Sequence, residues 1–272
     1  MVLKIQYLGT SIIKISKKNF KMKCVILAGG LGTRLAEETK TKPKPMVKIG
    51  NQPIIWHIMK IYRHYGVKNF IILSGYKEQI LKNYFKKNFN KINNKKYSTY
   101  YDPKSDFFVT CINTGLKTNT AGRILKIKNI LMKEKKFFLT YGDGVSNINI
   151  GKTFKIFNEK KYYALVSAVK PPARYGVLKF NKNLVVNKFQ EKIDNKNIWI
   201  NGGFFIFSNQ IFKHIKKYSS SLEYETLPSL IKKGKLMAYD HKGFWACMDT
   251  IRDKINLNKI WKSKNVPWKM WL

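Results

Sequence analysis

Short apolar runs alternate with longer mixed segments through the first part of this chain. Residues 22–28 and 69–73 are apolar runs of strand length, typical of buried strands. Between them, residues 53–62 begin with proline and are followed by Gly66, which predicts a helix. The lysine-rich segment 77–88 predicts a second helix. This strand–helix order predicts a parallel sheet with right-handed crossovers.

The rest of the chain continues the same pattern. Residues 97–112 alternate in places, which predicts an antiparallel excursion from the sheet. We therefore expect an α/β fold with a Rossmann-like, mostly parallel sheet and an added β-rich part. The further elements expected are strands at 137–140, 163–169, 176–180, 184–190, 199–207 and 235–240, and helices at about 121–133, 209–216, 225–233 and 250–262.

No linker, low-complexity tract or internal repeat divides the 272 residues. We expect a single domain over 22–272, with residues 1–21 as an N-terminal extension outside the core. The longest apolar runs fall well short of the ~20 residues that a membrane helix needs. Residues 1–20 contain no continuous apolar stretch of the signal-peptide kind. The sequence therefore predicts a cytoplasmic protein with no membrane partner.

The net charge of +38 suggests an anionic partner, but its distribution argues against specific nucleic-acid binding. Only five of the 53 basic residues are arginine, and the lysines are spread through the chain. Binders of nucleic acid usually cluster their basic residues, with arginine prominent. The three cysteines, Cys24, Cys111 and Cys247, are far apart, so neither a disulfide framework nor a zinc site is expected.

A glycine-rich loop follows the first predicted strand. LAGGLGTRL occupies residues 27–35, and KPKPM at 42–46 adds cations on a backbone stiffened by proline. Glycines at 29, 30 and 32 can adopt positive φ, so that successive N–H groups face one concavity and hold phosphate oxygens. The spacing is neither GxGxxG nor GxxxxGK[ST]. Strand, glycine turn, Arg34 and Lys44 together predict a nucleotide-phosphate site.

These residues carry a resemblance to a known family. LAGGLGTRL…KPKPM is similar to the signature of the sugar-1-phosphate nucleotidyltransferases. The similarity runs from Met22 to the last residues of the chain. The further segments that carry it are LTYGDGVSNINI at 139–150, WINGGFFIF at 199–207, GFWACMDTIRD at 243–253 and NVPWKMW at 265–271.

The resemblance implies a fold of the nucleotidyltransferase type, in which the β-rich part binds the sugar. It implies CTP and α-D-glucose 1-phosphate as substrates, CDP-glucose and pyrophosphate as products, and Mg²⁺ as cofactor. It also implies a homo-oligomer that supplies dideoxyhexoses for surface polysaccharide. Preference for another base or sugar stays open, as does a non-catalytic paralogue that binds sugar nucleotides.

Two aspartates are the candidate metal ligands. Asp143 lies between two glycines directly after a predicted strand, where an Asx turn and a metal site are equally reasonable interpretations. Asp249 precedes a predicted helix, where helix capping is the alternative role. The resemblance implies that this pair holds Mg²⁺, which prefers oxygen ligands.

The resemblance also assigns the remaining site residues. Arg34 and Lys44 are the catalytic candidates, because each would neutralise charge on the phosphates. Two departures from the family pattern stand out, namely Ile193 where proline is usual and Ala121 where glycine is usual. The nucleotide-binding candidates are Leu27, Ala28, Gly29, Gly30, Leu31, Gly32, Thr33, Arg34, Lys44, Thr118, Arg123 and Gly142; the sugar-phosphate candidates are Glu191, Lys192, Asn201 and Gly202.

Overall fold

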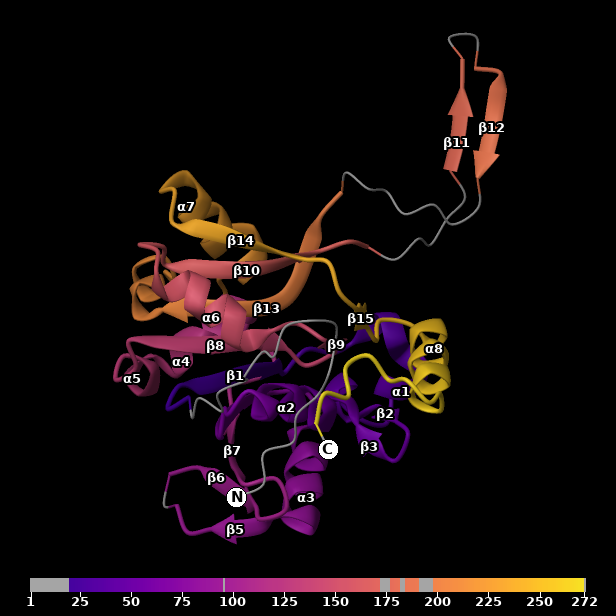
Figure 1. The fold of residues 1–272 in the computed structure, drawn as a ribbon. Coiled ribbons are helices and arrows are strands. Elements are labelled where there is room, and N and C mark those ends of the chain that lie inside the picture. The colour runs from indigo at the N-terminus through magenta and orange to yellow at the C-terminus, as the bar shows by residue number, and fades with distance from the viewer. Residues whose placement is uncertain (1–19, 95, 172–176, 182–183, 191–197, 272) are drawn as a thin grey trace, which may run out of the picture.

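A central sheet of nine strands runs through the computed structural model, which describes residues 20–94, 96–171, 177–181, 184–190 and 198–271. All of these strands except β6 and β13 run in the same direction, so the sheet is mostly parallel and the expected α/β fold class is confirmed. From edge to edge the order is β14 (Leu236–His241), β10 (Ala164–Val169), β13 (Ile200–Ser208), β8 (Lys136–Tyr141), β1 (Lys23–Ala28), β4 (Asn69–Ser74), β7 (Phe107–Asn113), β6 (Ser98–Asp102) and β5 (Asn90–Ile92) (Figure 1).

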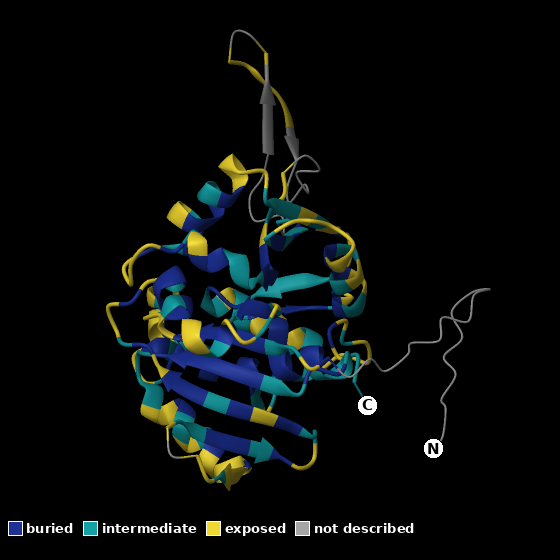
Figure 2. Cartoon of the chain, turned by 90° about the vertical axis from the view of Figure 1, so that its left-hand side faces the viewer, coloured by how far each residue is buried: buried dark blue, intermediate teal, exposed yellow. Residues whose placement is uncertain are grey.

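Helices cover both faces of this sheet. Residues of α2 (Ile54–His64), α3 (Glu78–Asn88) and α6 (Ile150–Asn158) belong to one apolar cluster. Residues of α4 (Thr120–Lys126), α5 (Lys128–Leu131) and α7 (Leu227–Lys232) belong to the other. Along β1, Cys24 and Ile26 face the first cluster while Val25 and Leu27 face the second. The strand is apolar throughout because neither face meets water, and Figure 2 shows the buried strands at the centre of the molecule.

Three small pairs of strands lie outside the central sheet. β2 (Lys48–Ile49) pairs with β3 (Gln52–Pro53), and β9 (Gly144–Ser146) pairs with β15 (Trp245–Cys247). The hairpin of β11 (Val177–Phe180) and β12 (Val186–Gln190) extends away from the body between β10 and β13 (Figure 1). Further elements are the short helices α1 (Ala36–Thr39), η1 (Thr33–Leu35) and η2 (Lys44–Met46), and the C-terminal helix α8 (Ile251–Trp261).

Three of the expected helices are wrong in extent. The helix expected at 121–133 is two helices, separated at Ile127, whose ψ of 17° ends the first. The segment 209–216 is a 3-10 helix, η3 (Asn209–Lys213). The segment 225–233 is a π-helical turn, η4 (Leu222–Thr226), followed by α7, because Pro228 has no N–H for a continuous α-helical ladder. Helix α6 was missed, although Asn149 caps it by accepting a hydrogen bond from the Lys152 N–H at 2.8 Å.

The C-terminal segment packs against α2. Trp268 is fully buried, and its Nε1 lies 3.4 Å from Nδ1 of His57 on α2. The ring of His57 also contacts that of Trp261, at the end of α8. Phe20, which the sequence analysis placed in the N-terminal extension, is buried against Phe138. Among the described residues, none of the helices has the length and apolar character needed to cross a membrane.

Candidate active site

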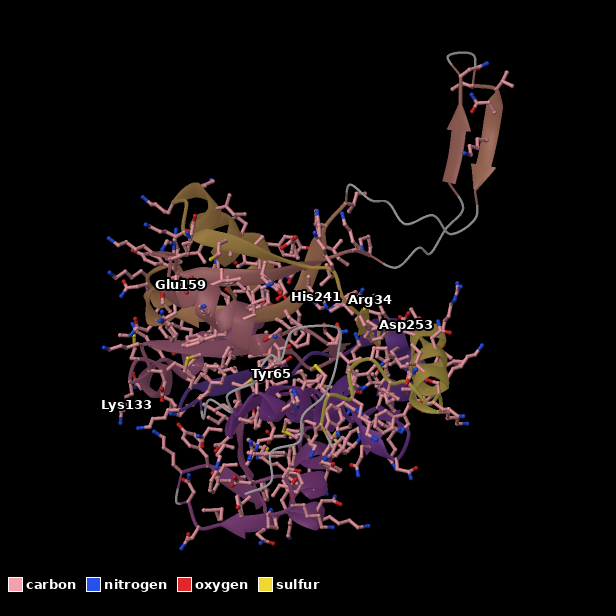
Figure 3. All side chains as sticks on the ribbon, viewed as in Figure 1. Arg34, Tyr65, Lys133, Glu159, His241 and Asp253 are labelled. Atoms are coloured by element: carbon pink, nitrogen blue, oxygen red, sulfur yellow. The ribbon has the colours of Figure 1, made fainter. Side chains whose placement is uncertain are left out.

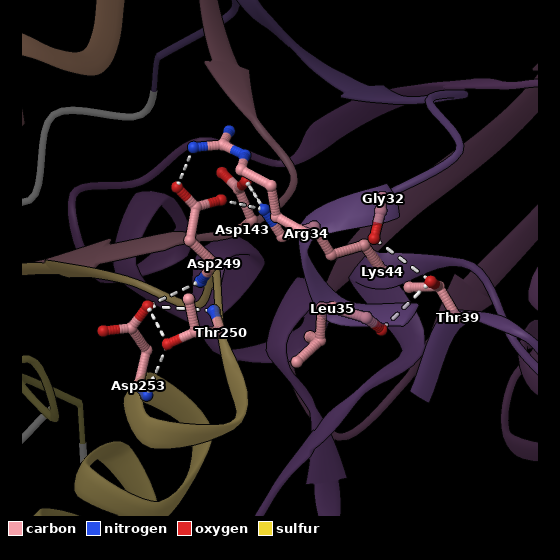
Figure 4. Close-up of polar contacts among 9 residues, drawn as sticks. All are labelled: Gly32, Arg34, Leu35, Thr39, Lys44, Asp143, Asp249, Thr250 and Asp253. Atoms are coloured by element: carbon pink, nitrogen blue, oxygen red, sulfur yellow. Dashed lines mark hydrogen bonds and ion pairs between the residues drawn. The ribbon is translucent and has the colours of Figure 1, made fainter. Parts of the chain in front are cut away.

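Four charged side chains meet beyond the carboxyl ends of β1 and β8. Nζ of Lys44 donates a hydrogen bond of 2.6 Å to Oδ2 of Asp143, and it also contacts Oδ1 of Asp249. Nη1 of Arg34 lies 2.6 Å from the second oxygen of Asp249. Figure 4 shows this cluster, which contains both predicted catalytic residues and both predicted metal ligands. Asp143 and Asp249 lie 99 and 205 positions from Lys44 in the sequence, and the fold brings both of them to its ammonium.

The two carboxylates are held at one place by a small sheet. Asp143 follows β8, and the next residue begins β9. Gly144 of β9 is the register partner of Cys247 of β15, and the N–H of Met248 donates to the carbonyl of Asp143 at 2.8 Å. Because Asp249 follows Met248, this pairing also places Asp249 close to Asp143. Figure 3 shows Arg34 by the start of α8, and Lys133 and Glu159 at the opposite end of the sheet.

A capping box fixes the backbone at Asp249. Thr250, not Asp249, caps α8, because its Oγ1 accepts from the N–H of Asp253. Oδ2 of Asp253 accepts in return from the backbone N–H of Thr250 at 2.9 Å and from that of Asp249 at 3.1 Å. The Asp249 carboxylate is therefore not used for capping, and it points to Lys44 and Arg34.

The glycine-rich loop differs in detail from the expectation. Of its three glycines only Gly32 has positive φ, at 69°, and the expectation of positive φ at Gly29 and Gly30 is wrong. The carbonyl of Gly32 accepts from Oγ1 of Thr39 at 3.1 Å, which ties the loop to α1. The turn of the loop therefore uses one left-handed residue, Gly32. Gly30 lies at an open position, where a Cβ would meet no atom within 4 Å.

Gly142 allows the end of β8 to approach the loop that carries Lys44. A Cβ at this position would lie 2.8 Å from both the carbonyl oxygen of Leu27 and Cγ of Pro45. Any side chain at position 142 would therefore push Pro45, and Lys44 with it, away from Asp143. The sequence named Gly142 as a nucleotide contact, and its packing gives it this spacing role as well.

Arg123 lies behind the glycine-rich loop. Only 4% of the residue is exposed, and its guanidinium donates to the carbonyls of Gly29, Ser74 and Gly115 and to Oγ1 of Thr114. These acceptors lie at the carboxyl ends of β1, β4 and β7 or directly after them. Arg123 therefore holds three loops together at the carboxyl edge of the sheet, and burial lowers the pKa of its guanidinium.

The second predicted nucleotide loop is closely packed. Thr118 is buried, and its hydroxyl donates to the carbonyl of Thr114 at 2.5 Å. Ala121 has ordinary helical geometry inside α4, so its departure from the family glycine causes no strain. Gly122 leaves no room for a side chain, because a Cβ would lie 1.8 Å from the carbonyl oxygen of Tyr218.

Lys44 and Arg34, the two catalytic candidates, differ sharply in burial and in the effect of the surrounding carboxylates. Burial acts to lower the pKa of Lys44, but the carboxylates of Asp143 and Asp249 outweigh it, so the pKa is raised. Lys44 therefore stays protonated at neutral pH, as a fixed point charge. The side chain of Arg34 is 74% exposed, so its fork can turn from Asp249 to a bound triphosphate.

The predicted sugar residues lie next to this cluster where the structure describes them. Nδ2 of Asn201 donates to the hydroxyl of Tyr141 at 3.1 Å, one residue before Gly142. The carbonyl of Gly202 accepts from Nε1 of Trp245 on β15 at 2.8 Å. Both contacts place β13 beside the segments that carry Asp143 and Asp249. Glu191, Lys192 and the departure at Ile193 lie outside the described residues.

Some residues that support the site were not predicted from the sequence. Trp245 and Tyr141 were quoted only as letters of matching segments, because an isolated aromatic residue gives no signal of its partners. Asp253 was detectable, since Thr250-Ile-Arg-Asp253 has the spacing of a capping box before an apolar helix.

The donor set fits a hard divalent cation. Asp143 and Asp249 present carboxylate oxygens to one shared cation, Lys44, so the oxygens converge on a single position. No cluster of three or more histidine, cysteine, aspartate or glutamate side chains occurs within the described part of the chain. Two carboxylates suffice for Mg²⁺, which usually completes its shell with water and substrate phosphates.

Comparison with known proteins decides the family. A model of the nucleotidyl transferase family matches residues 23–262. The chain belongs to the nucleotidyl transferase family. It is therefore a nucleotidyltransferase, and the resemblance noted in the sequence is confirmed.

Individual relatives agree with this assignment. Glucose-1-phosphate cytidylyltransferase of Salmonella typhimurium is 40% identical over 257 residues, covering 92% of this chain and 100% of the relative. The probable glucose-1-phosphate cytidylyltransferase of Bacillus subtilis is 39% identical over the same shares of both chains.

A solved structure confirms the architecture. HddC from Yersinia pseudotuberculosis superposes with a TM-score of 0.68 at 26% identity, covering 89% of this chain and 100% of that protein. The putative thymidylyltransferase of Bacillus anthracis has a TM-score of 0.67, but at 18% identity it supports the fold alone.

Proposed function

We propose that this nucleotidyltransferase transfers the cytidylyl group of CTP to α-D-glucose 1-phosphate. The observation that carries the proposal is the contact of one partly buried ammonium, that of Lys44, with both Asp143 and Asp249. That cluster lies beside Asn201 and Gly202, the sugar-phosphate candidates. The choice of CTP and glucose rests on relatives about 40% identical over nearly the whole chain.

The reaction needs little covalent chemistry from the protein. A phosphate oxygen of glucose 1-phosphate forms a bond to the α-phosphorus of CTP while the bond to the bridging oxygen breaks, and pyrophosphate leaves with that electron pair. The attacking oxygen is already ionised at neutral pH, so no general base is required. Catalysis then consists of holding the two phosphates in line and stabilising charge between them.

The charged residues divide that work. Lys44, kept protonated by its two carboxylates, places a point charge where the attacking oxygen meets the α-phosphate. Arg34, whose side chain is exposed, binds two triphosphate oxygens at once and stabilises charge on the departing pyrophosphate. Asp143 and Asp249 would hold Mg²⁺, which when bound adds positive charge beside the phosphates.

The rest of the site positions the substrates. The loop from Leu27 to Thr33, with Gly142 against it, receives the nucleotide phosphates, and Arg123 keeps that loop joined to the neighbouring strand ends. Asn201 and Gly202 bind the hexose, with Glu191 and Lys192 as further contacts. Supply of dideoxyhexoses for surface polysaccharide, a cytoplasmic location and a homo-oligomeric assembly stay predictions of the sequence.

The test is pyrophosphate release from the purified protein with Mg²⁺, glucose 1-phosphate and each of CTP, UTP, dTTP, ATP and GTP in separate reactions. We expect release with CTP alone, and none from Asp143→Ala. Release with another nucleotide would retain nucleotidyl transfer and overturn the base assignment. No release with any nucleotide or hexose 1-phosphate, from a folded sample, would favour the non-catalytic paralogue.

A further inference from the structure

A second polar cluster lies beside the charged one and has a different chemistry. It joins Tyr141 at the end of β8, Asn201 of β13 and Glu223 of η4. The Tyr141 hydroxyl and Oε1 of Glu223 are 2.5 Å apart, and Nδ2 of Asn201 is 3.1 Å from the same hydroxyl. Three segments that are distant in the sequence therefore converge on one phenol oxygen.

The direction of each hydrogen bond in this cluster is determined. A carboxylate can only accept, so the Tyr141 proton points to Glu223. Asn201 then donates to Tyr141, and its amide orientation is fixed independently because its Oδ1 accepts from the Gly203 N–H at 2.9 Å. One lone pair of Tyr141 and one N–H of Asn201 are left for a ligand. The pair thus offers one acceptor and one donor side by side.

Glu223 is itself held firmly by hydroxyl groups. Its Oε2 accepts from Oγ1 of Thr120 at 2.7 Å and from Oγ of Ser221 at 2.8 Å. Thr120 opens α4 directly after the second nucleotide loop, and its hydroxyl also accepts from the Leu222 N–H. In a chain with 53 basic residues, the contacts that orient this carboxylate are nevertheless hydroxyl groups. These hydroxyl donors fix the orientation of the Glu223 carboxylate through hydrogen bonds and not through an ion pair.

Two members of the cluster line a groove whose other walls are apolar. Asn201 and Glu223 line a groove of about 440 Å³ together with Trp199 and Leu227, a volume within the usual range for small ligands. Asn201 links the groove to Tyr141, which lies two residues before Asp143, so a hexose that contacts Asn201 and Tyr141 is close to the proposed metal site. A hexose suits this wall, because each sugar hydroxyl is both a donor and an acceptor.

We propose that Tyr141 and Asn201 recognise a hydroxyl of the hexose 1-phosphate, and that Glu223 is the positioning residue that fixes their donor–acceptor polarity. The inference rests on the proposed function and adds a specificity determinant to it. A sugar whose hydroxyl lies elsewhere leaves both groups unpaired, which is a strong basis for discrimination.

Replacing Glu223 by glutamine makes a specific change. The hydroxyls of Thr120 and Ser221 donate to the Oε2 position, so they retain the glutamine oxygen there. The amide NH₂ must then face Tyr141 and donate to it. The Tyr141 proton turns toward the ligand, and the polarity of the pair is reversed without loss of volume.

The experiment measures KM and kcat for glucose 1-phosphate, galactose 1-phosphate and mannose 1-phosphate, and KM for CTP. For Glu223→Gln we expect KM for glucose 1-phosphate to rise about 10-fold, and its kcat/KM advantage over the epimers to fall about 10-fold, with KM for CTP unchanged. Tyr141→Phe, which keeps the ring that packs on Gly203, should give the same pattern.

Glu225→Gln is the matched control. Glu225 belongs to the same turn but is exposed and accepts from Ser220 and Ser221, so its KM values should stay within about twofold of the wild type. Thermal melting checks that each variant is folded. An unchanged hexose KM and epimer ratio in both Glu223→Gln and Tyr141→Phe would overturn the inference while leaving nucleotidyl transfer intact. Failure of the wild type to use any hexose 1-phosphate would instead overturn the proposed function.

Discussion

The two polar clusters at this edge of the sheet work by different physics. The cluster of Lys44, Asp143, Asp249 and Arg34 is ionic, and its members are bound to one another through opposite charge. The cluster of Tyr141, Asn201 and Glu223 has one formal charge, and direction rather than charge decides what it binds. The comparison teaches that charge suits phosphates, which all substrates of such an enzyme share, whereas directed hydrogen bonds suit hydroxyls, which distinguish one sugar from another.

The largest effect should follow from breaking the ionic cluster at Asp143. Asp143→Asn keeps the size of the side chain but removes charge, and we expect kcat to fall about 1,000-fold, with the epimer ratio of the residual activity unchanged. Steady-state pyrophosphate release measures both quantities. Asp240→Asn, an exposed aspartate of β14, is the control and should retain wild-type kcat. Equal loss in both variants would contradict a special role for Asp143.

Lys44 should show opposite effects on catalysis and on metal binding. In Lys44→Met the two carboxylates lose their shared ammonium, so kcat should fall about 100-fold. Mg²⁺ should nevertheless bind more tightly, because the carboxylate charge is no longer neutralised. The rise of the melting temperature with Mg²⁺ measures this, and a smaller rise than in the wild type would contradict it.

Acid should weaken the packing that holds α8, and thereby Asp249, in place. Burial lowers the pKa of His57 from its usual value to about 4. The unfolded state therefore binds the proton more readily, and stability is lost as the pH falls from about 6.5 toward 4. We expect His57 to contribute about 2 kcal/mol of destabilisation between pH 7 and pH 5.

Denaturant unfolding at the two pH values measures this loss. His57→Phe should show a smaller loss by that amount, because the titrating group is gone. An identical pH dependence in the wild type and the variant would show that His57 does not titrate in this way.

The capping box should give the smallest effect, and it separates stability from metal binding. Asp253→Ala removes the oxygen that accepts from the N–H groups of Asp249 and Thr250, at a cost of about 1 kcal/mol. It should also raise the Mg²⁺ concentration needed for half-maximal activity. Asn149→Ala, which uncaps α6 away from the site, should lower stability similarly with no change in the Mg²⁺ requirement. The same Mg²⁺ shift in both variants would refute a positioning role for Asp253.

The ionic cluster could be predicted because each of its members lies in a contiguous motif that carries the family resemblance. Lys44 lies between two prolines, Asp143 between two glycines, and Asp249 follows a short apolar run before a helix. The strands were also predictable, since a strand covered on both faces, such as β1, is apolar throughout. Local pattern predicts such strands directly, whereas at Asp143 and Asp249 it left a turn or a helix cap as the alternative to a metal site.

The hydroxyl-directing cluster depends on long-range pairing, and no local pattern reports it. Tyr141 and Glu223 are 82 positions apart, and they meet because β13 pairs with β8 and η4 packs on α4. Helix extents failed for a related reason. The chain leaves helical geometry at Ile127, whose ψ is 17°, and Pro228 cannot donate the N–H that a continuous α-helix after the π-helical turn would need, so the helices end where the periodic pattern alone does not indicate it.

The most direct test of nucleotidyl transfer at this site is a single turnover with CTP labelled at the α-phosphate, in the presence of glucose 1-phosphate and Mg²⁺. The wild type should pass the label into CDP-glucose, and Asp143→Asn should leave it in CTP over the same time. Label that stays in CTP with the wild-type enzyme, or that appears in CMP, would contradict the transfer of a cytidylyl group to the sugar phosphate.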